Sequence, residues 1–240
     1  MNLSPELAQR LWRGSDLART RLPGVPSGFS QLDAELPGGG WPAGVLTELL
    51  PAHEGIGELR LLGPALARLS SRGGRLAWIA PPYRPYAPAL AAAGIDASRL
   101  VIVRTGSAKD ALWAAEQALR SNACAAVLAW PGSPRYEELR RLQLAAEGSN
   151  SLALLFRPPS SAREPSPAAL RIAVDTREGG LALRILKRRG APLARAVILP
   201  ATQSGLSIAG RKKDRFSHDL DSRSPARAAP GKPAARLVLS

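Results

Sequence analysis

Short apolar runs alternate with longer amphipathic segments through most of the chain. The runs typical of buried strands cover residues 45–50, 75–79, 100–103, 123–129 and 152–156. Segments with apolar residues at helical spacing lie between them, at residues 55–71, 86–93, 108–120 and 134–147. Strands that are separated by helices are joined by right-handed crossovers and form a parallel sheet with helices on both faces. The pattern therefore predicts an α/β fold with a mainly parallel sheet.

The pattern changes after residue 156. Three further strands are predicted at residues 170–174, 181–187 and 194–199, and the first two are joined by a turn through residues 175–180. Because no helical segment separates these strands, we expect a β-meander that extends or flanks the main sheet.

The two ends of the chain differ from this central part. Ser4-Pro5-Glu6 is a typical helix start and predicts a short N-terminal amphipathic helix. Beyond residue 200, Ser, Gly, Arg, Lys, Pro and Ala dominate, and too few large apolar residues remain to offset the entropy cost of ordering. We therefore expect an N-terminal helix and linker at 1–44, a core with its meander at 45–200, and a disordered basic tail at 201–240.

Composition and charge narrow the possible functions. The 240-residue chain has a formal net charge of +14, and residues 157–240 carry 17 basic and 6 acidic side chains against 16 and 13 before them. This asymmetry favours a polyanionic partner for the C-terminal third. A single cysteine, Cys124, and two histidines, His53 and His218, exclude most metal sites and all disulfide frameworks within the chain. No apolar run approaches the length of a membrane span, so we expect a cytoplasmic protein with no membrane partner.

The turn after the first core strand is the usual place for a phosphate-binding loop in an open α/β sheet. Hydrolysis of a nucleotide there requires a Lys for the β- and γ-phosphates and a following hydroxyl for Mg²⁺. The turn here has neither residue, and its two carboxylates would repel a triphosphate. The residues of this degenerate phosphate loop are Pro51, His53, Glu54, Gly55, Gly57 and Glu58.

A second requirement of nucleotide hydrolysis is also missing. An Asp at the end of a buried strand normally holds the water of the metal ion, but the strand 123–129 and the Trp130-Pro131 that follow it contain no carboxylate. Glu58 is better explained as a residue of the first helical turn that complements the helix dipole. We therefore expect no catalytic residue, no cofactor and no metal, although an ATPase with an atypical loop remains a minor alternative.

Ordered motifs in the first half of the chain resemble a known family. Residues 25–33, which end in Ser30-Gln31-Leu32-Asp33, and residues 36–48, which run from Leu36-Pro37-Gly38-Gly39-Gly40 to Glu48, resemble the approach to the phosphate loop in RecA-type recombinases. In that family the approach has the form S-x-x-L-D followed by L-G-G-G-x-P-x-G-x-[IV]-x-E. Residues 54–59, residues 186–192 and Leu11-Trp12-Arg13-Gly14 are similar to motifs of the RecA-like, SulA-like group that includes the ImuA family.

The resemblance implies a role that the composition alone does not. It implies a RecA-like domain that acts in damage-induced translesion DNA synthesis without catalysis. The implied partners are an ImuB-type Y-family polymerase homologue, RecA, an error-prone C-family polymerase subunit and DNA, with association with the nucleoid under DNA damage. The alternative is a SulA-like inhibitor of cell division that binds the tubulin-like protein FtsZ during the SOS response.

Several surface residues are candidates for contact with DNA or a partner. Basic clusters and exposed aromatic side chains beside arginine are typical of such contacts, but solvated strand ends or a rigid proline loop explain them as well. The candidates are Lys187, Arg188, Arg189, Arg211, Lys212, Lys213, Arg215, Tyr83, Arg84 and Tyr86. The apolar end of the chain, residues 236–239, is idle, adds as a strand to a partner's sheet or docks in a groove. We expect Trp78, Trp113 and Trp130 to pack in or beside the core.

Overall fold

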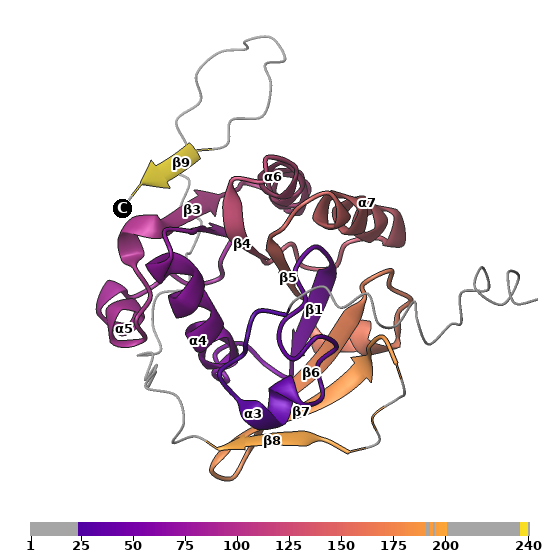
Figure 1. The fold of residues 1–240 in the computed structure, drawn as a ribbon. Coiled ribbons are helices and arrows are strands. Elements are labelled where there is room, and N and C mark those ends of the chain that lie inside the picture. Colours follow the sequence, from indigo (N-terminus) through magenta and orange to yellow (C-terminus); the bar gives the residue numbers. More distant parts are fainter. Residues whose placement is uncertain (1–23, 191–192, 194, 201–235, 240) are drawn as a thin grey trace, which may run out of the picture.

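The computed structural model describes residues 24–190, 193 and 195–200 and the backbone of strand 236–239. One nine-stranded sheet with the order β8-β7-β6-β1-β5-β4-β2-β3-β9 runs through this part of the chain (Figure 1). The strands are β1 (Leu46–Pro51), β2 (Arg75–Ile79), β3 (Leu100–Arg104), β4 (Cys124–Ala129), β5 (Leu152–Phe156), β6 (Leu170–Arg177), β7 (Gly180–Lys187), β8 (Val197–Pro200) and β9 (Arg236–Leu239).

The middle of the sheet is parallel and its two ends are antiparallel. Strands β6, β1, β5, β4, β2 and β3 pair in parallel with one another. Strands β7 and β8 add antiparallel beyond β6, and β9 adds antiparallel to β3. This arrangement confirms the predicted α/β fold with a mainly parallel sheet followed by a meander.

Helices cover both faces of the parallel strands, as expected for crossover connections (Figure 1). Helix α4 packs over one face with the residues of α3 and α5, while α6 and α7 lie together on the other face. The helices are α3 (Ser30–Asp33), α4 (Glu58–Ser71), α5 (Ala87–Ala92), α6 (Ala108–Arg120) and α7 (Tyr136–Glu147), with 3-10 helices η1 (Ala97–Arg99) and η2 (Pro159–Arg163).

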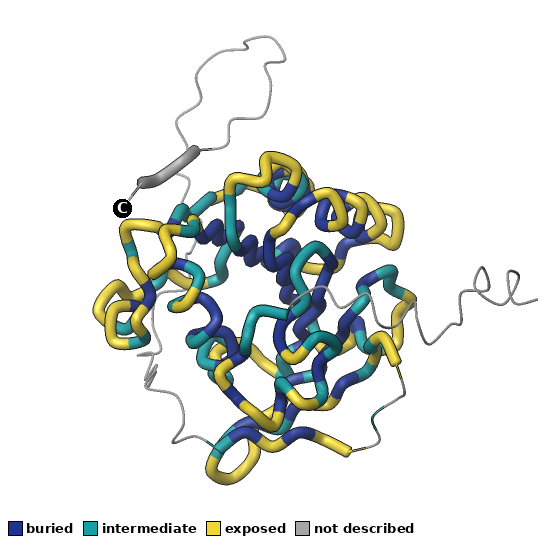
Figure 2. Tube along the Cα trace, viewed as in Figure 1, coloured by how far each residue is buried: buried dark blue, intermediate teal, exposed yellow. Residues whose placement is uncertain are grey.

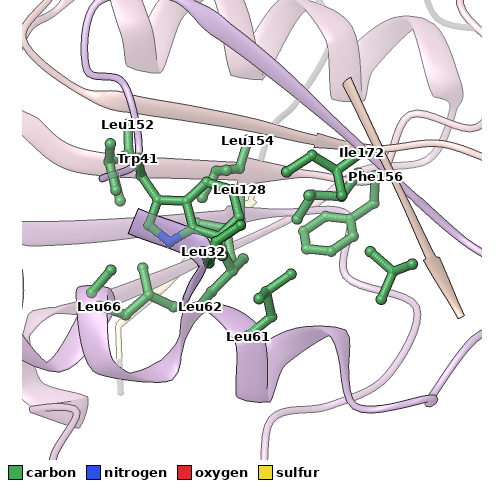
Figure 3. Packing of buried hydrophobic residues seen from close by; sticks show 14 of the residues in the cluster. Leu32, Trp41, Leu61, Leu62, Leu66, Leu128, Leu152, Leu154, Phe156 and Ile172 are labelled. Atoms are coloured by element: carbon green, nitrogen blue, oxygen red, sulfur yellow. The ribbon is translucent and has the colours of Figure 1, made fainter. Parts of the chain in front are cut away.

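Alternate residues of the central strands belong to two separate hydrophobic clusters. In β2, Leu76 and Trp78 face α4, whereas Ala77 and Ile79 face α6 and α7. On the α4 side, leucines of the helix meet side chains from several strands, as Figure 3 shows. Because both faces are covered, the central strands are buried nearly throughout, as the dark centre of Figure 2 shows.

Residues 24–44 are part of this core, which differs from the linker that the sequence suggested. Phe29, Leu32, Leu36 and Trp41 are all at most 4% exposed. A β-bridge between Val25 and Trp41 closes this segment into a loop with two backbone hydrogen bonds. The backbones approach so closely that a Cβ on the glycine before Trp41 would lie 2.4 Å from the Val25 carbonyl oxygen. The Gly-rich stretch therefore allows the two backbone segments to pack closely, and this packing explains the glycine next to Trp41 without a function.

The structure also differs from the sequence-based prediction in the β6–β7 hairpin and at the end of the chain. Strands β6 and β7 reach further than predicted, so the turn between them shrinks from residues 175–180 to Glu178-Gly179. Residues 236–239, expected at the end of a disordered tail, form β9 and pair with β3 of the same chain rather than with a partner. The predicted N-terminal helix and residues 201–235 of the predicted tail lie outside the described residues.

Candidate functional site

The degenerate phosphate loop connects the end of β1 to the start of α4, as predicted. The loop begins close to the sheet, where the Ala52 amide donates to the Val174 carbonyl of β6 at 2.8 Å. It ends at Gly57, which precedes the helix with φ +99° and no side-chain cap. Ile56 packs against the core and anchors the middle of the loop. The loop therefore places backbone amides at the positive end of a 14-residue helix, where an anion would be favoured.

The loop has two carboxylates, and one of them occupies that favourable position itself. Glu58 is the first residue of α4 and is only 8% exposed. Its Oε2 atom is buried and has no hydrogen-bond partner among the described residues. Glu54 lies in the exposed part of the loop, where the Tyr83 hydroxyl donates to its Oε2 at 2.8 Å. The loop thus has two carboxylates and neither the lysine nor the hydroxyl of a nucleotide-binding loop, and this negative charge favours a cation over a phosphate.

Aromatic side chains lie at the ends of β4 and β5, two neighbouring strands of the sheet. Trp130 follows β4 and stacks on Phe156 at the end of β5, with ring centroids 4.4 Å apart and planes within 1°. Trp78 of β2 lies 6.1 Å from Trp130, centroid to centroid. These rings therefore lie at and beside the end of β4, the strand on which a site for nucleotide hydrolysis would need a carboxylate. The packing also shows that Trp78 and Trp130 pack beside the core, as predicted.

A buried network of charged side chains lies on the α7 side of the sheet, and the sequence analysis did not detect it. Glu48 of β1 is fully buried and accepts hydrogen bonds from Arg171 Nε at 2.7 Å and Arg157 Nη1 at 3.2 Å. Ser166 Oγ donates to the same carboxylate at 2.6 Å. Arg157 also binds Glu164 at 2.6 Å. The signal available in the sequence was Glu48 itself, a charged residue within an apolar strand.

The basic segment at the end of β7 is engaged within the chain to a large extent. Lys187 Nζ donates to the Ser166 carbonyl at 2.9 Å. Arg188 donates to the Glu35 carboxylate at 2.8 Å and also to the Glu35 carbonyl. Arg189 is exposed. Lys187 and Arg188 therefore attach the end of β7 to its surroundings.

The aromatic candidates after β2 are exposed, whereas a tryptophan expected in the core is not buried. Tyr83 is 48% exposed and Tyr86 69% exposed, and Arg84 between them is also exposed. Trp113 on α6 is 48% exposed, so the prediction that it packs in or beside the core was wrong. Its helix buries the neighbouring Leu112 instead, because the buried stripe of α6 runs through residues 111, 112, 115 and 119.

The remaining points concern the basic candidates near the end of the chain, a metal site and a membrane span. Arg211, Lys212, Lys213 and Arg215 lie outside the described residues. Within the described part, no three His, Cys, Asp or Glu side chains are grouped so that they could hold a metal ion. No helix of the same part has the length and apolar character of a membrane span.

Comparison with known proteins agrees with the motif resemblance. The chain is 33% identical to Protein ImuA of Caulobacter vibrioides over 134 residues, which is 54% of this chain and 55% of that protein. It is 34% identical to the cell division inhibitor SulA of Edwardsiella piscicida over 98 residues, which is 41% of this chain and 58% of that protein. No family model matches the chain.

These alignments span little more than half the length of the relatives that the chain matches. The similarity to ImuA nevertheless extends over more of this chain than the similarity to SulA does. The predicted resemblance is thereby confirmed at the level of sequence: this chain is similar to ImuA over about half its length and to SulA over a shorter stretch.

Proposed function

We propose that this chain is a non-catalytic, RecA-like accessory protein of the DNA-damage response that acts as an adaptor in translesion synthesis. The observation that carries the proposal is the loop between β1 and α4. Its position is that of a phosphate loop, but buried Glu58 lies at the start of α4 and Glu54 is bound by Tyr83. The sequence similarity to ImuA supports the biological setting.

A physical argument connects the loop to the absence of hydrolysis. Two like charges 4 Å apart repel by about 4 kcal/mol at an effective dielectric constant of about 20. A triphosphate placed on the amides of α4 would meet Glu58 at that range, without a lysine to compensate. Because the loop disfavours the charge of a nucleotide, the fold serves better as a surface for other macromolecules than as an ATPase.

Phosphate release tests the absence of hydrolysis directly. The full-length chain is incubated with Mg-ATP, with and without single-stranded DNA, and we expect no release above a control without protein. If release is found, Gly57→Ala is compared with Gly179→Ala, a matched change at another positive φ that lies in the β6–β7 turn. Turnover that Gly57→Ala reduces and Gly179→Ala preserves would refute the proposal, because it would place hydrolysis in this loop.

Co-purification tests the adaptor role. The chain is co-expressed with the Y-family polymerase homologue of the same genome, and we expect the two to elute together in size-exclusion chromatography. The loop variant Arg84→Glu/Tyr86→Ser changes exposed residues only. Separate elution of the unchanged proteins would contradict the adaptor role. Loss of the complex in the variant, with Arg140→Glu on α7 as the matched control, would assign the contact to the 81–86 loop.

The basic residues outside the described part are tested by neutralisation rather than by truncation, because removal of residues 205–240 would also remove β9 from the edge of β3. We expect glutamine at Arg211, Lys212, Lys213 and Arg215 to weaken DNA binding. The slope of log affinity against log salt should fall in magnitude by about 0.9 for each lost contact with a duplex phosphate. An unchanged slope would remove these residues from DNA binding.

The similarity to SulA favours a second candidate, an inhibitor of cell division. Its distinguishing test is expression in growing cells of a bacterium without added DNA damage. Filamentous growth, together with binding of the purified chain to the tubulin-like division protein, would favour this candidate over the adaptor. Normal division and a stable complex with the polymerase homologue would favour the adaptor.

A further inference from the structure

The two edges of the nine-stranded sheet differ in how far their backbone groups are paired. At one edge, β9 pairs with β3 over four residues and covers its backbone groups. At the other edge, no strand among the described residues pairs with the outer side of β8. An edge strand with free N–H and C=O groups is a template for another extended chain unless charge, proline or a covering element protects it. The β8 edge is therefore the place where an added strand can extend this sheet.

A groove lies beside the start of β8. Gln31 and Glu35, which belong to α3 and the turn that follows it, form one wall, and Leu193 and residues 195–198 form the other. Its volume is about 560 Å³. The groove is lined by the first two residues of β8 and by the residues before them, so it lies where an extended segment beside this strand would begin.

The side chains of β8 present an apolar residue beside this groove. Val197 and Leu199 point into the core and are 8% and 2% exposed, whereas Ile198 between them is 40% exposed. Figure 2 shows this end of the sheet with exposed segments beside buried ones. Ile198 is in register with Ala182 of β7, which is half-buried, so the two form a small apolar strip on the outer face. An added strand would cover Ile198 with every second side chain.

Two arginines lie near this apolar strip, and one exposed carboxylate, Asp175 of β6, is in register with Ala182 on the same face. Arg195 is exposed two residues before β8 and lines the groove. Arg184 is exposed on β7, on the same face as Ala182 and two residues away from it. The one carboxylate that lines the groove, Glu35, is already paired with Arg188 at 2.8 Å. The surroundings of Ile198 therefore favour a partner with acidic side chains, in accord with the net charge of +14.

We propose that the β8 edge and its groove, which we name the β8 groove, bind an extended segment of another protein in which apolar and acidic residues alternate. The segment pairs with the backbone of β8 and lays its apolar side chains over Ile198, and its carboxylates meet Arg184 and Arg195. Pro200 has no N–H group, so pairing is centred on residues 197–199. The binding mode does not depend on which protein carries the segment, and so it goes beyond the proposed adaptor role.

A second copy of this chain fits the groove less well than an acidic segment. Antiparallel pairing of two β8 strands would bring the arginines of both copies to the same interface. Like charges across an interface oppose association unless they are paired. Two copies that each carry +14 add to this repulsion at low salt.

Selection from a peptide library tests the proposal without knowledge of the natural partner. A phage library of random 12-residue peptides is panned on the full-length chain, and the selected peptides are synthesised for fluorescence anisotropy. We expect alternating apolar and acidic residues in the selected peptides. Ile198→Lys should lower their affinity at least tenfold, whereas Leu144→Lys, at a leucine of α7 that is 58% exposed, should leave it unchanged. Circular dichroism confirms that both variants are folded.

Backbone methylation separates strand pairing from simple contact with an apolar patch. Single N-methyl groups are placed along the best peptide, and strand pairing predicts loss of binding at every second position, because only alternate amides face β8. The proposal is overturned if no peptide is selected, if Ile198→Lys binds as well as the parent, or if methylation acts without alternation. A concentration-dependent dimer that Ile198→Lys dissociates would overturn it as well, since the occupant would then be a second copy.

Discussion

Replacement of Glu48 by glutamine tests whether the buried charge network holds the sheet together. The carboxylate is fully buried and is shared by Arg157 and Arg171, whose side chains are 0% and 8% exposed. Glutamine has nearly the same shape but removes the negative charge. Arg157 would then keep the Glu164 carboxylate, which is 47% exposed, as its charged partner, whereas Arg171 would keep only the backbone carbonyls of Ser161 and Glu164.

The magnitude follows from the burial of these groups. Removal of one partner from a buried ion pair costs about 3–5 kcal/mol, because the remaining charge stays in a poorly solvated place. For a domain of this size, each kcal/mol lowers the melting temperature by about 2–4 °C. We therefore expect Glu48→Gln to lower the melting temperature by about 6–20 °C. Glu164→Gln, at the exposed end of the same network, should cost less than about 1 kcal/mol.

The assay is urea denaturation of both variants and the parent, followed by circular dichroism, with thermal melts as a second measurement. An m-value that does not change would show that the difference lies in stability and not in the compactness of the unfolded state. A loss below about 1 kcal/mol for Glu48→Gln would refute the reasoning, since the guanidinium groups would then have an adequate alternative to the carboxylate.

Three further changes test other parts of the structure. Gly57→Ala should destabilise the chain by about 1–2 kcal/mol, because its φ of +99° disfavours a side chain; an unchanged urea midpoint would mean that the loop relaxes. Burial raises the pKa of the Cys124 thiol, so iodoacetamide at pH 8 should react with it more slowly than with a free cysteine, and the rate should still rise above pH 9. Equal rates, followed by mass spectrometry, would contradict this. Arg188→Ala should lower the free energy of unfolding by about 1 kcal/mol, since it removes the contacts with the Glu35 carboxylate and carbonyl. Thermal melting measures this change, and an unchanged melting temperature would show that water replaces these contacts without loss of stability.

Much of the parallel sheet could be predicted because its signals are local. Apolar runs and helical spacing predicted β2, β5 and α6 with the same bounds that the structure has. Each of these elements has a continuous buried stripe or run that needs no distant partner to be recognised. The turn between β1 and α4 was also placed correctly, since its position follows from strand and helix order alone.

Features that depend on distant contacts were missed. The bonds of Glu48 to Arg157 and Arg171 join residues more than 100 positions apart, and no periodicity indicates such a pairing. Trp41 is buried through a bridge to Val25, although turn residues around it resemble a linker. Strand β9 is four residues long and its partner β3 lies far away in the sequence. A short apolar segment of this kind becomes a strand only because it pairs with the edge of a sheet. The local sequence pattern contains no information about that edge.

The carboxylates between β1 and α4 have a consequence for how such a loop could change during evolution. A lysine that arose in this turn would approach Glu58 before it met any nucleotide, and their mutual attraction would hold it away from a phosphate. Loss of Glu58 alone would leave the helix end without its negative partner and would bring no gain in binding. Since neither substitution improves nucleotide binding by itself, a working phosphate loop would require several simultaneous substitutions. Single substitutions on the outer surface of the domain can change its function more readily.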